Sequence, residues 1–73
     1  MEFKVVLEYD EEEQCWVTHV PSLDGVCTWG KTREEALSNT CEAITGYLEA
    51  IKKEGLPLPS PRPVEITEVV IAE

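Results

Sequence analysis

The sequence has few basic residues, and this shortage limits the partners that it can bind. Six lysines and arginines stand against 15 aspartates and glutamates in 73 residues, which gives a net charge of −9 at pH 7. Such a surface repels phosphate backbones and anionic lipids, and it favours a basic protein as partner. We therefore expect no direct binding to nucleic acid and none to a membrane.

Long apolar runs are also missing. No stretch approaches the roughly 18 consecutive apolar residues of a membrane-spanning helix, and the first residues lack the basic-then-apolar pattern of a signal peptide. We therefore expect a cytoplasmic protein. Residues 1–73 are enough for one domain with a small core, and a core of this size favours self-association.

Cysteines are scarce and carry no metal-binding spacing. Cys15, Cys27 and Cys41 are odd in number and form no C-x-x-C pair. This pattern suits reduced, buried thiols better than disulfides or a zinc site. We therefore predict no metal ion held by the cysteines.

Residues 32–55 show the pattern of one long amphipathic helix. Thr32 and Glu35 fit a capping box, in which the Thr32 hydroxyl accepts the Glu35 backbone N–H and the Glu35 carboxylate reaches back to the N–H of Thr32. Gly55 suits the left-handed position that closes a helix. Apolar residues recur at three- and four-residue spacing at Leu37, Cys41, Ile44, Leu48 and Ile51. Nothing else in the chain has a helical pattern, so a sheet must cover this stripe.

Three segments before the helix read as strands. Apolar and charged residues alternate in residues 2–9, which indicates a strand with one buried face. Residues 15–20 and 26–29 are short, rich in β-branched and aromatic residues, and bounded by turn signals. Four prolines in residues 56–63 exclude a helix or a central strand there, and residues 64–72 then predict a fourth strand.

These elements predict an α+β fold with the order β-β-β-α-β. We expect a four-stranded mixed sheet of strand order 3-2-1-4, with one helix packed on one face. The second half of the last strand is apolar on both sides, and such a strand is normally covered on both. We therefore predict a homodimer or higher oligomer with Val69 and Ile71 in its interface.

Residues 25–32 match the G-x-x-x-x-G-K-T pattern of a phosphate-binding loop. Such a loop needs a turn whose consecutive backbone N–H groups surround the phosphate. Residues 26–29 instead have the composition of a strand, and Trp29 would crowd the phosphate. A nucleotide-hydrolysing domain also needs helices on both faces of a parallel sheet. We therefore predict no nucleotide cofactor.

The carboxylates do not predict a catalytic metal site. Magnesium-dependent hydrolysis needs several carboxylates that converge from different elements. Among the candidates Glu8, Asp10 and Glu35, the last belongs to the helix cap and Asp10 lies in an acidic turn. His19, the only histidine, has no obvious nucleophile beside it. We predict no enzyme activity, with no catalytic residue, no metal and no cofactor.

Two features remain as candidate partner-binding sites. Trp16 and Trp29 lie on neighbouring predicted strands, where a core role competes with a role as an interface anchor. Trp29 is the better interface candidate, because Leu23 can join it in an exposed apolar patch. The acidic turn after the first strand is a solvated loop or a contact for a partner, with Asp10 and Glu12 as candidates.

Residues 16–36 resemble a known family. They contain an aromatic strand, then Pro-Ser-Leu-Asp-Gly, then Gly-Lys-Thr-Arg-Glu-Glu-Ala at the helix start, and this ordered series is similar to the HicB-type antitoxin domain. Ser22 and Asp24 stand where the family usually has Asp and Pro. The resemblance implies a partial ribonuclease-H-like fold that binds a HicA-like toxin, a small basic mRNA interferase.

Many members of this family continue into a DNA-binding module, whereas this sequence ends at Glu73. The resemblance therefore implies a toxin-neutralising domain of a toxin-antitoxin system without its DNA-binding half. An alternative function remains, which is an orphan oligomeric regulatory or scaffold domain without a toxin partner.

Overall fold

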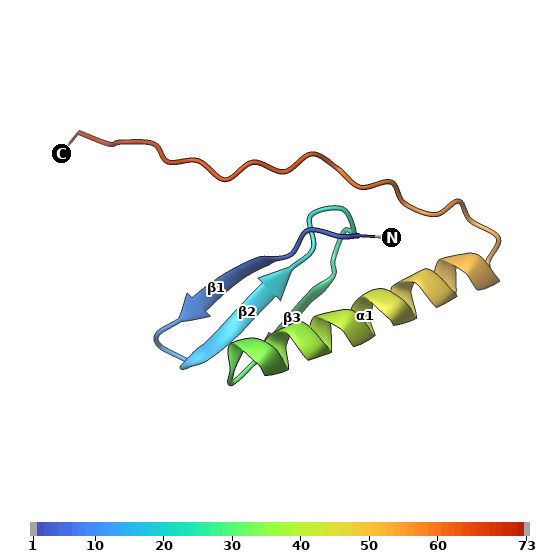
Figure 1. Ribbon diagram of the computed structural model, residues 1–73, viewed down its shortest axis with the longest axis horizontal. Coiled ribbons are helices and arrows are strands. Elements are labelled where there is room, and N and C mark those ends of the chain that lie inside the picture. The colour runs from blue at the N-terminus through green and yellow to red at the C-terminus, as the bar shows by residue number, and fades with distance from the viewer. Residues whose placement is uncertain (1, 73) are drawn as a thin grey trace.

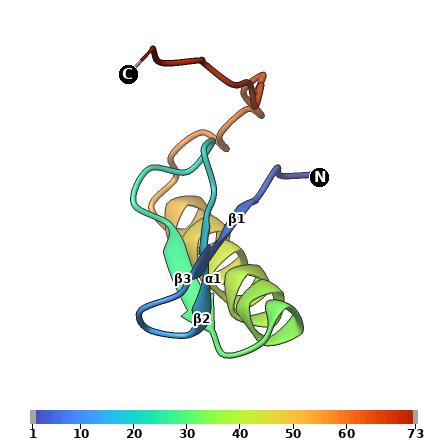
Figure 2. The ribbon, with the colours of Figure 1, turned by 90° about the vertical axis from the view of Figure 1, so that its left-hand side faces the viewer.

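The computed structural model describes residues 2–72. Its elements follow the order β1 (Val6–Asp10), β2 (Cys15–His19), β3 (Cys27–Gly30) and α1 (Arg33–Lys53), as Figure 1 shows. The three strands form an antiparallel sheet of order β1-β2-β3. The helix lies along one face of this sheet, and Figure 2 views the two layers from the end.

The β1–β2 hairpin is closed by the acidic turn. The Asp10 side chain accepts the backbone N–H of Glu12 at 3.0 Å and that of Glu13 at 3.2 Å. Gln14 adopts a left-handed φ of 51° and returns the chain so that Cys15 pairs with Asp10. Aspartate is common in such turns because its side chain can bond its own backbone two residues on.

The register of β2 and β3 decides which side chains the helix covers. Thr18 pairs with Thr28, and the next pair along is Val17 with Trp29. The two threonine hydroxyls meet Thr40 of α1, so this pair faces the helix. Successive side chains of a strand point to opposite faces, and Val17 and Trp29 therefore point away from the helix.

The helix begins at Thr32, as the sequence predicts. The Thr32 hydroxyl accepts the Glu35 backbone N–H at 3.0 Å, which satisfies one of the donors left free at a helix start. The reciprocal bond differs from the prediction by one residue, because the Glu35 carboxylate accepts the N–H of Lys31 at 3.2 Å.

The end of the helix also follows the prediction. Gly55 has φ of +73°, a conformation that glycine adopts without a Cβ clash. Its N–H donates to Lys52 O at 3.1 Å, and the Leu56 N–H donates to Ile51 O at 2.9 Å. These two bonds form a Schellman motif, which satisfies carbonyls left free in the last turn.

The helix packs on β3 and β2, and in the described part of the chain it does not reach β1. Gly30 lies directly against the first turn of the helix, because a Cβ at Gly30 would lie 2.9 Å from the Ala36 Cα and 2.8 Å from the Glu35 carbonyl carbon. The buried Thr18, Ala36 and Thr40 meet in this layer, and Val20 and Leu23 of the β2–β3 turn complete the set of most deeply buried side chains.

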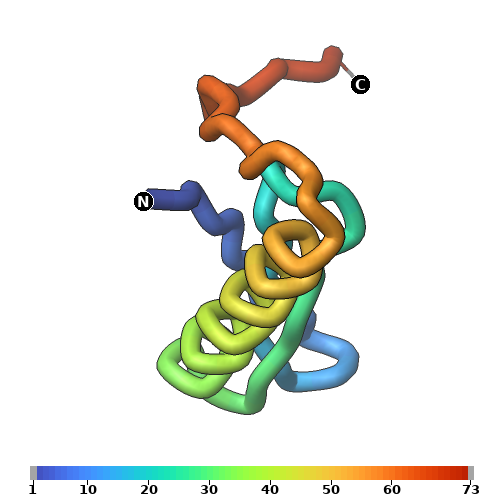
Figure 3. Tube along the Cα trace, turned by 90° about the vertical axis from the view of Figure 1, so that its right-hand side faces the viewer, coloured from blue at the N-terminus to red at the C-terminus, as the bar shows by residue number. Residues whose placement is uncertain are grey.

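The predicted fourth strand does not form, so the predicted β-β-β-α-β fold with a sheet order of 3-2-1-4 is wrong. Residues 64–72 are extended but lie in no sheet, and Figures 1 and 3 show them apart from the strands and the helix. Val69 is 79% exposed and Ile71 is 74% exposed. The alternating pattern gave these residues the propensity of a strand, but no strand edge in residues 2–72 pairs with them.

The connector before this segment is tied to the body of the chain at one place. The Arg62 backbone N–H donates to the buried Ser22 hydroxyl at 3.0 Å, and its guanidinium lies 3.6 Å from the Asp24 carboxylate. The ion pair is exposed and therefore weak, but the bond to Ser22 fixes where the chain leaves. Pro63 follows immediately and stiffens the exit.

Candidate functional site

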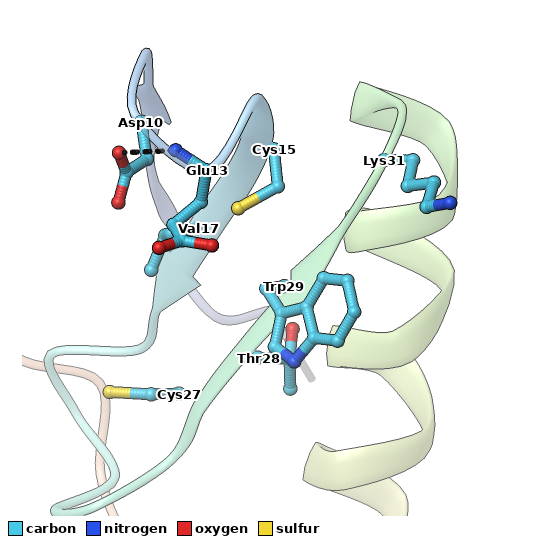
Figure 4. A pocket seen from close by; sticks show the side chains of 8 residues that line it. All are labelled: Asp10, Glu13, Cys15, Val17, Cys27, Thr28, Trp29 and Lys31. Atoms are coloured by element: carbon cyan, nitrogen blue, oxygen red, sulfur yellow. Dashed lines mark hydrogen bonds between the residues drawn. The ribbon is translucent and has the colours of Figure 1, made fainter.

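The sheet face opposite the helix carries a shallow hollow of about 540 Å³. No element of residues 2–72 covers this face, and Figure 4 shows the side chains around the hollow. The residues that line the hollow come from the β1–β2 turn, β2, β3 and the residue after β3, and they are Asp10, Glu13, Cys15, Val17, Cys27, Thr28, Trp29 and Lys31. The Thr28 hydroxyl itself is bonded on the helix side of the sheet. We call this region the open face.

Trp29 and Val17 form the apolar centre of the open face. The Trp29 side chain is 59% exposed and Val17 is 37% exposed, and the two are direct cross-strand partners. Figure 4 shows the indole ring standing out from β3. Contiguous exposed apolar patches mark interaction surfaces, and tryptophan is among the residues enriched in binding hot spots.

Carboxylates border one side of the hollow. Asp10 and Glu13 lie on the β1–β2 turn, and the exposed Glu12 lies between them in sequence. Figure 4 shows Lys31 at the opposite side, with its amine pointing away from both carboxylates. The open face thus combines an apolar centre with an acidic border, although Asp10 also has a structural role because its side chain closes the turn.

Cys15 lies at the floor of the hollow and is 8% exposed. Burial raises the pKa of its thiol above the ordinary value, and the negative charges of Asp10 and Glu13 raise it further. A raised pKa leaves less thiolate near neutral pH, so this cysteine is a poor nucleophile. Cys27 and Cys41 are exposed, whereas the sequence predicted all three thiols to be buried.

The structure does not bring Leu23 to the open face. Leu23 is 1% exposed and lies in the core, so the expected surface patch of Leu23 and Trp29 does not form. The β2–β3 turn explains this position. Its chain is folded tightly by bonds from the Leu23 N–H to Val20 O at 3.0 Å and from the Val26 N–H to Leu23 O at 3.2 Å, and this places the leucine under the turn.

The G-x-x-x-x-G-K-T pattern forms no phosphate-binding loop. Its middle is strand β3, which pairs with β2, so the strand's backbone is extended and cannot surround a phosphate. Thr32 accepts the N–H of Glu35 in the helix cap. Glu35 in turn accepts the Lys31 N–H, which places a carboxylate where a phosphate would need a free donor.

The carboxylates do not converge either. In residues 2–72 no three histidine, cysteine, aspartate or glutamate side chains are placed to hold a metal ion. Asp10 is used in the turn and Glu35 in the cap, and Glu8 is exposed on β1. His19 is exposed at the end of β2, opposite Val6 and Cys27.

Sequence reasoning missed a cluster of three threonine hydroxyls between the sheet and the helix. The Oγ1 atoms of Thr18, Thr28 and Thr40 lie 2.6 to 2.8 Å apart, and the Thr40 hydroxyl donates to Ala36 O at 2.8 Å. Only the strand register brings Thr18 and Thr28 together, so no local pattern could have signalled the cluster. The three hydroxyls find their partners within this cluster and at the Ala36 carbonyl, which makes them part of the core rather than a binding site.

Comparison with known proteins identifies the family. The HicB_like antitoxin of bacterial toxin-antitoxin systems matches residues 3–71. The chain belongs to the HicB-like antitoxin family. The resemblance in the turn and helix cap is therefore confirmed, and a role in toxin-antitoxin systems is the general function of this family.

Several relatives of this HicB-like chain cover most of its length. A UPF0150 protein of Thermoplasma acidophilum is 42% identical over 67 residues, which are 92% of this chain and 96% of the relative. One from Archaeoglobus fulgidus is 42% identical over 52 residues, or 71% of this chain and 74% of the relative. The crystal structure of the N-terminal domain of Burkholderia pseudomallei antitoxin HicB matches with a TM-score of 0.71 and 33% identity, over 96% of this chain and 74% of that chain.

The helix of this HicB-like chain does not resemble a membrane span. Among residues 2–72, no helix combines the length and apolar character needed to cross a bilayer.

Proposed function

We propose that this HicB-like chain is a non-enzymatic protein-binding module of the cytoplasm that neutralises a small basic toxin, an mRNA interferase of the HicA kind. The observation that carries the proposal is the exposed Trp29 at the centre of an uncovered sheet face with an acidic border. Family membership supplies the class of partner, because antitoxins of this family act in toxin-antitoxin pairs.

The charge of the chain suits a basic partner. A net charge of −9 attracts a cationic protein over a distance of about one Debye length, near 8 Å at physiological salt, and it raises the rate of encounter. Glu12 on the acidic border contributes to this attraction. Only its backbone N–H is bonded in the turn, so its carboxylate is available to a partner. Electrostatic complementarity of this kind gives rate and specificity more than affinity.

The indole supplies the affinity. In a complex, Trp29 would enter a pocket of the toxin and lose its contact with water, which is how interface hot spots act. Val17 beside it extends the apolar contact. Occupation of the toxin's basic surface by this face would then exclude messenger RNA, which needs the same positive charges.

The test is a binding measurement with a purified HicA-like toxin from the same cell. Trp29→Ala should weaken binding about 30-fold or more, which corresponds to about 2 kcal/mol for a hot spot. Leu58→Ala is the matched control, because Leu58 is 53% exposed but lies on the connector, and it should leave affinity unchanged. Binding should also weaken as salt rises. Equal affinity of the two variants would refute the role of the open face.

The non-enzymatic part of the proposal has its own test. Neither a phosphate loop nor a carboxylate cluster forms among residues 2–72. Lys31→Ala should therefore leave any weak ATP association unchanged, and Asp10→Asn should leave the background of magnesium-dependent RNA cleavage unchanged. Saturable ATP binding that is lost in Lys31→Ala, or RNA cleavage that is lost in Asp10→Asn, would overturn the non-enzymatic function.

The alternative is an orphan domain that assembles with itself and has lost its toxin. The exposed apolar residues 64–72 favour self-assembly whichever function holds. The toxin-binding measurement distinguishes the two functions, because an orphan domain would show no measurable affinity for the HicA-like toxins of its own cell.

A further inference from the structure

Residues 64–72, called the C-terminal segment below, are far more exposed than an apolar segment should be. Ile66 is 81% exposed and Val70 is 94% exposed, in addition to Val69 and Ile71. β-Branched residues dominate the segment, and such residues favour a paired strand. In the structure the segment is extended and lies in no sheet, so its main chain has no strand partner among residues 2–72, and its apolar side chains from Ile66 onward are exposed.

The chain exposes more surface than a compact monomer of its mass, and the excess is large enough for a protein–protein interface. A compact monomer of 8.2 kDa would expose about 4,500 Å², whereas this chain exposes 6058 Å². The excess of about 1,500 Å² is larger than the ~800 Å² that each partner buries in a standard interface. The radius of gyration agrees, since it is 14.5 Å and a compact chain of this length has about 11 Å.

The sheet offers one free edge. β1 pairs only with β2 among the described residues, and α1 does not extend over it. The other outer strand, β3, is shorter, and its Trp29 carbonyl already accepts the Asn39 side-chain amide at 2.8 Å. Unpaired strand edges accept further strands, so β1 is the edge available to an extended segment.

The C-terminal segment lies apart from β1 of its own chain. The bond from the Arg62 N–H to Ser22 fixes the connector beside the β2–β3 turn, and Pro59, Pro61 and Pro63 hold the chain extended on both sides of it. Figure 2 shows the segment leaving the body beyond this point. The solved HicB domain matches 96% of this chain, which leaves out about three of the 73 residues, so most of the segment is included in the match.

We infer that the C-terminal segment of one copy lies along the free edge of β1 in a second copy, and that the exchange is reciprocal. Each copy then donates one segment and receives one, related by a twofold axis. The exchange covers the exposed apolar side chains and the free edge at once, and each chain keeps its own three-stranded sheet. The inference does not depend on the proposed toxin, because it uses only this chain.

The affinity of this dimer should rise with salt concentration, because both copies are acidic. Two copies each carry −9 and repel one another, and salt screens that repulsion. Raising NaCl from about 0.05 M to about 0.5 M should therefore lower the dissociation constant of the dimer several-fold. The affinity for a basic toxin should instead fall as salt rises, because salt then screens an attraction. The salt dependence therefore distinguishes dimer formation from toxin binding.

The first test is light scattering of the full chain at micromolar concentration. We expect a mass of 16.4 kDa, twice 8.2 kDa, which falls to the single-chain mass in Val69→Asp with Ile71→Asp. Ser38→Asp with Thr45→Asp is the matched control; it adds the same charge on exposed positions of α1 and should keep the dimer. Far-ultraviolet circular dichroism checks that both variants retain the helix.

The second test locates the contact. In an equal mixture of isotope-labelled and unlabelled chains, isotope-filtered nuclear Overhauser effects should join residues 64–72 of one copy to β1 of the other. A single-chain mass at both salt concentrations would overturn the inference. So would a dimer that survives the double substitution, or intermolecular contacts that join the two segments to each other instead of to β1.

Discussion

The hydroxyl oxygens of Thr18 and Thr40 lie 2.6 Å apart in the buried layer between β2 and α1. Both side chains are 1% exposed, and Thr28 on β3 joins them at 2.7 and 2.8 Å. Each hydroxyl has one proton, and that of Thr40 is donated to Ala36 O. At most two protons then remain for three oxygen–oxygen contacts, so the cluster has no spare donor.

Replacement of Thr40 by valine keeps the shape of the side chain but removes its hydroxyl. Thr18, which is 1% exposed, would then have only the half-buried Thr28 as a partner through its hydroxyl and carbonyl. We expect Thr40→Val to lower the free energy of unfolding by about 1 to 3 kcal/mol. Chemical denaturation measures this change. The matched control is Thr45→Val on the exposed side of α1, which should stay within about 0.5 kcal/mol; equal effects at the two positions would contradict the hydroxyl cluster.

Gly30 allows the helix to approach β3. A methyl group at this position would collide with the Ala36 backbone nitrogen, and it would lie 2.9 Å from the Ala36 Cα. Backbone atoms cannot rotate away as a side chain can, so the helix would have to move. We expect Gly30→Ala to destabilise the fold by about 1 to 3 kcal/mol.

Gly46 provides the control for this substitution. It lies in α1, and a Cβ there would meet nothing within 4 Å. Gly46→Ala should therefore stabilise the chain by about 0.5 to 1 kcal/mol, because alanine favours the helix more than glycine does. If chemical denaturation shows that Gly30→Ala lowers the free energy of unfolding and Gly46→Ala raises it, the packing of Gly30 on α1 is supported. An increase in both variants would argue against that packing.

The sequence predicted the elements that depend on local signals. The capping pair Thr32 and Glu35 and the left-handed Gly55 act within one helix, so the local pattern was sufficient. The predicted apolar stripe was less accurate, because the side chains that α1 buries are Ala36 and Thr40, whereas the stripe residues are half-buried or, at Cys41, exposed. The three strands of the meander were found within a few residues of their ends for a similar reason. Their turns are short, and the register follows from them.

The parts that failed depend on distant contacts. Residues 64–72 have the composition of a strand, but pairing requires an edge in reach, and the Arg62–Ser22 bond that directs the chain away leaves no signal in the sequence. The burial of Leu23 has the same origin, because the fold of the turn around it decides which side it faces. Trp29 was placed correctly on an outer strand, but its exposure followed from the helix covering the other face.

The helix cap gives a third prediction. Thr32→Ala removes the acceptor of the Glu35 N–H, a bond of 3.0 Å, and it should cost about 1 kcal/mol. Ser38→Ala within α1 is the control, since Ser38 is exposed and caps nothing. If thermal denaturation showed the same midpoint for Thr32→Ala and the unchanged protein, the cap would have no part in stability.

The thiols give the last two predictions, and the first concerns their reactivity. Burial raises the pKa of Cys15, and the charges of Asp10 and Glu13 add to this effect. Alkylation with iodoacetamide, followed by mass spectrometry near pH 8, should therefore modify the exposed Cys27 and Cys41 first and Cys15 last. In denaturant the three thiols should react at similar rates, because the fold causes the difference.

The same raised pKa makes stability depend on pH in a definite direction. The folded chain holds the Cys15 proton more tightly than the unfolded chain does, so this contribution is present below the ordinary value of 9.0 and is lost as pH rises through the higher folded value. Cys15→Ala should therefore remove part of the decrease in stability above pH 9.0, whereas Cys27→Ala should not. An identical pH dependence in the two variants, or alkylation of Cys15 as fast as that of Cys27, would show that the Cys15 thiol is open to solvent.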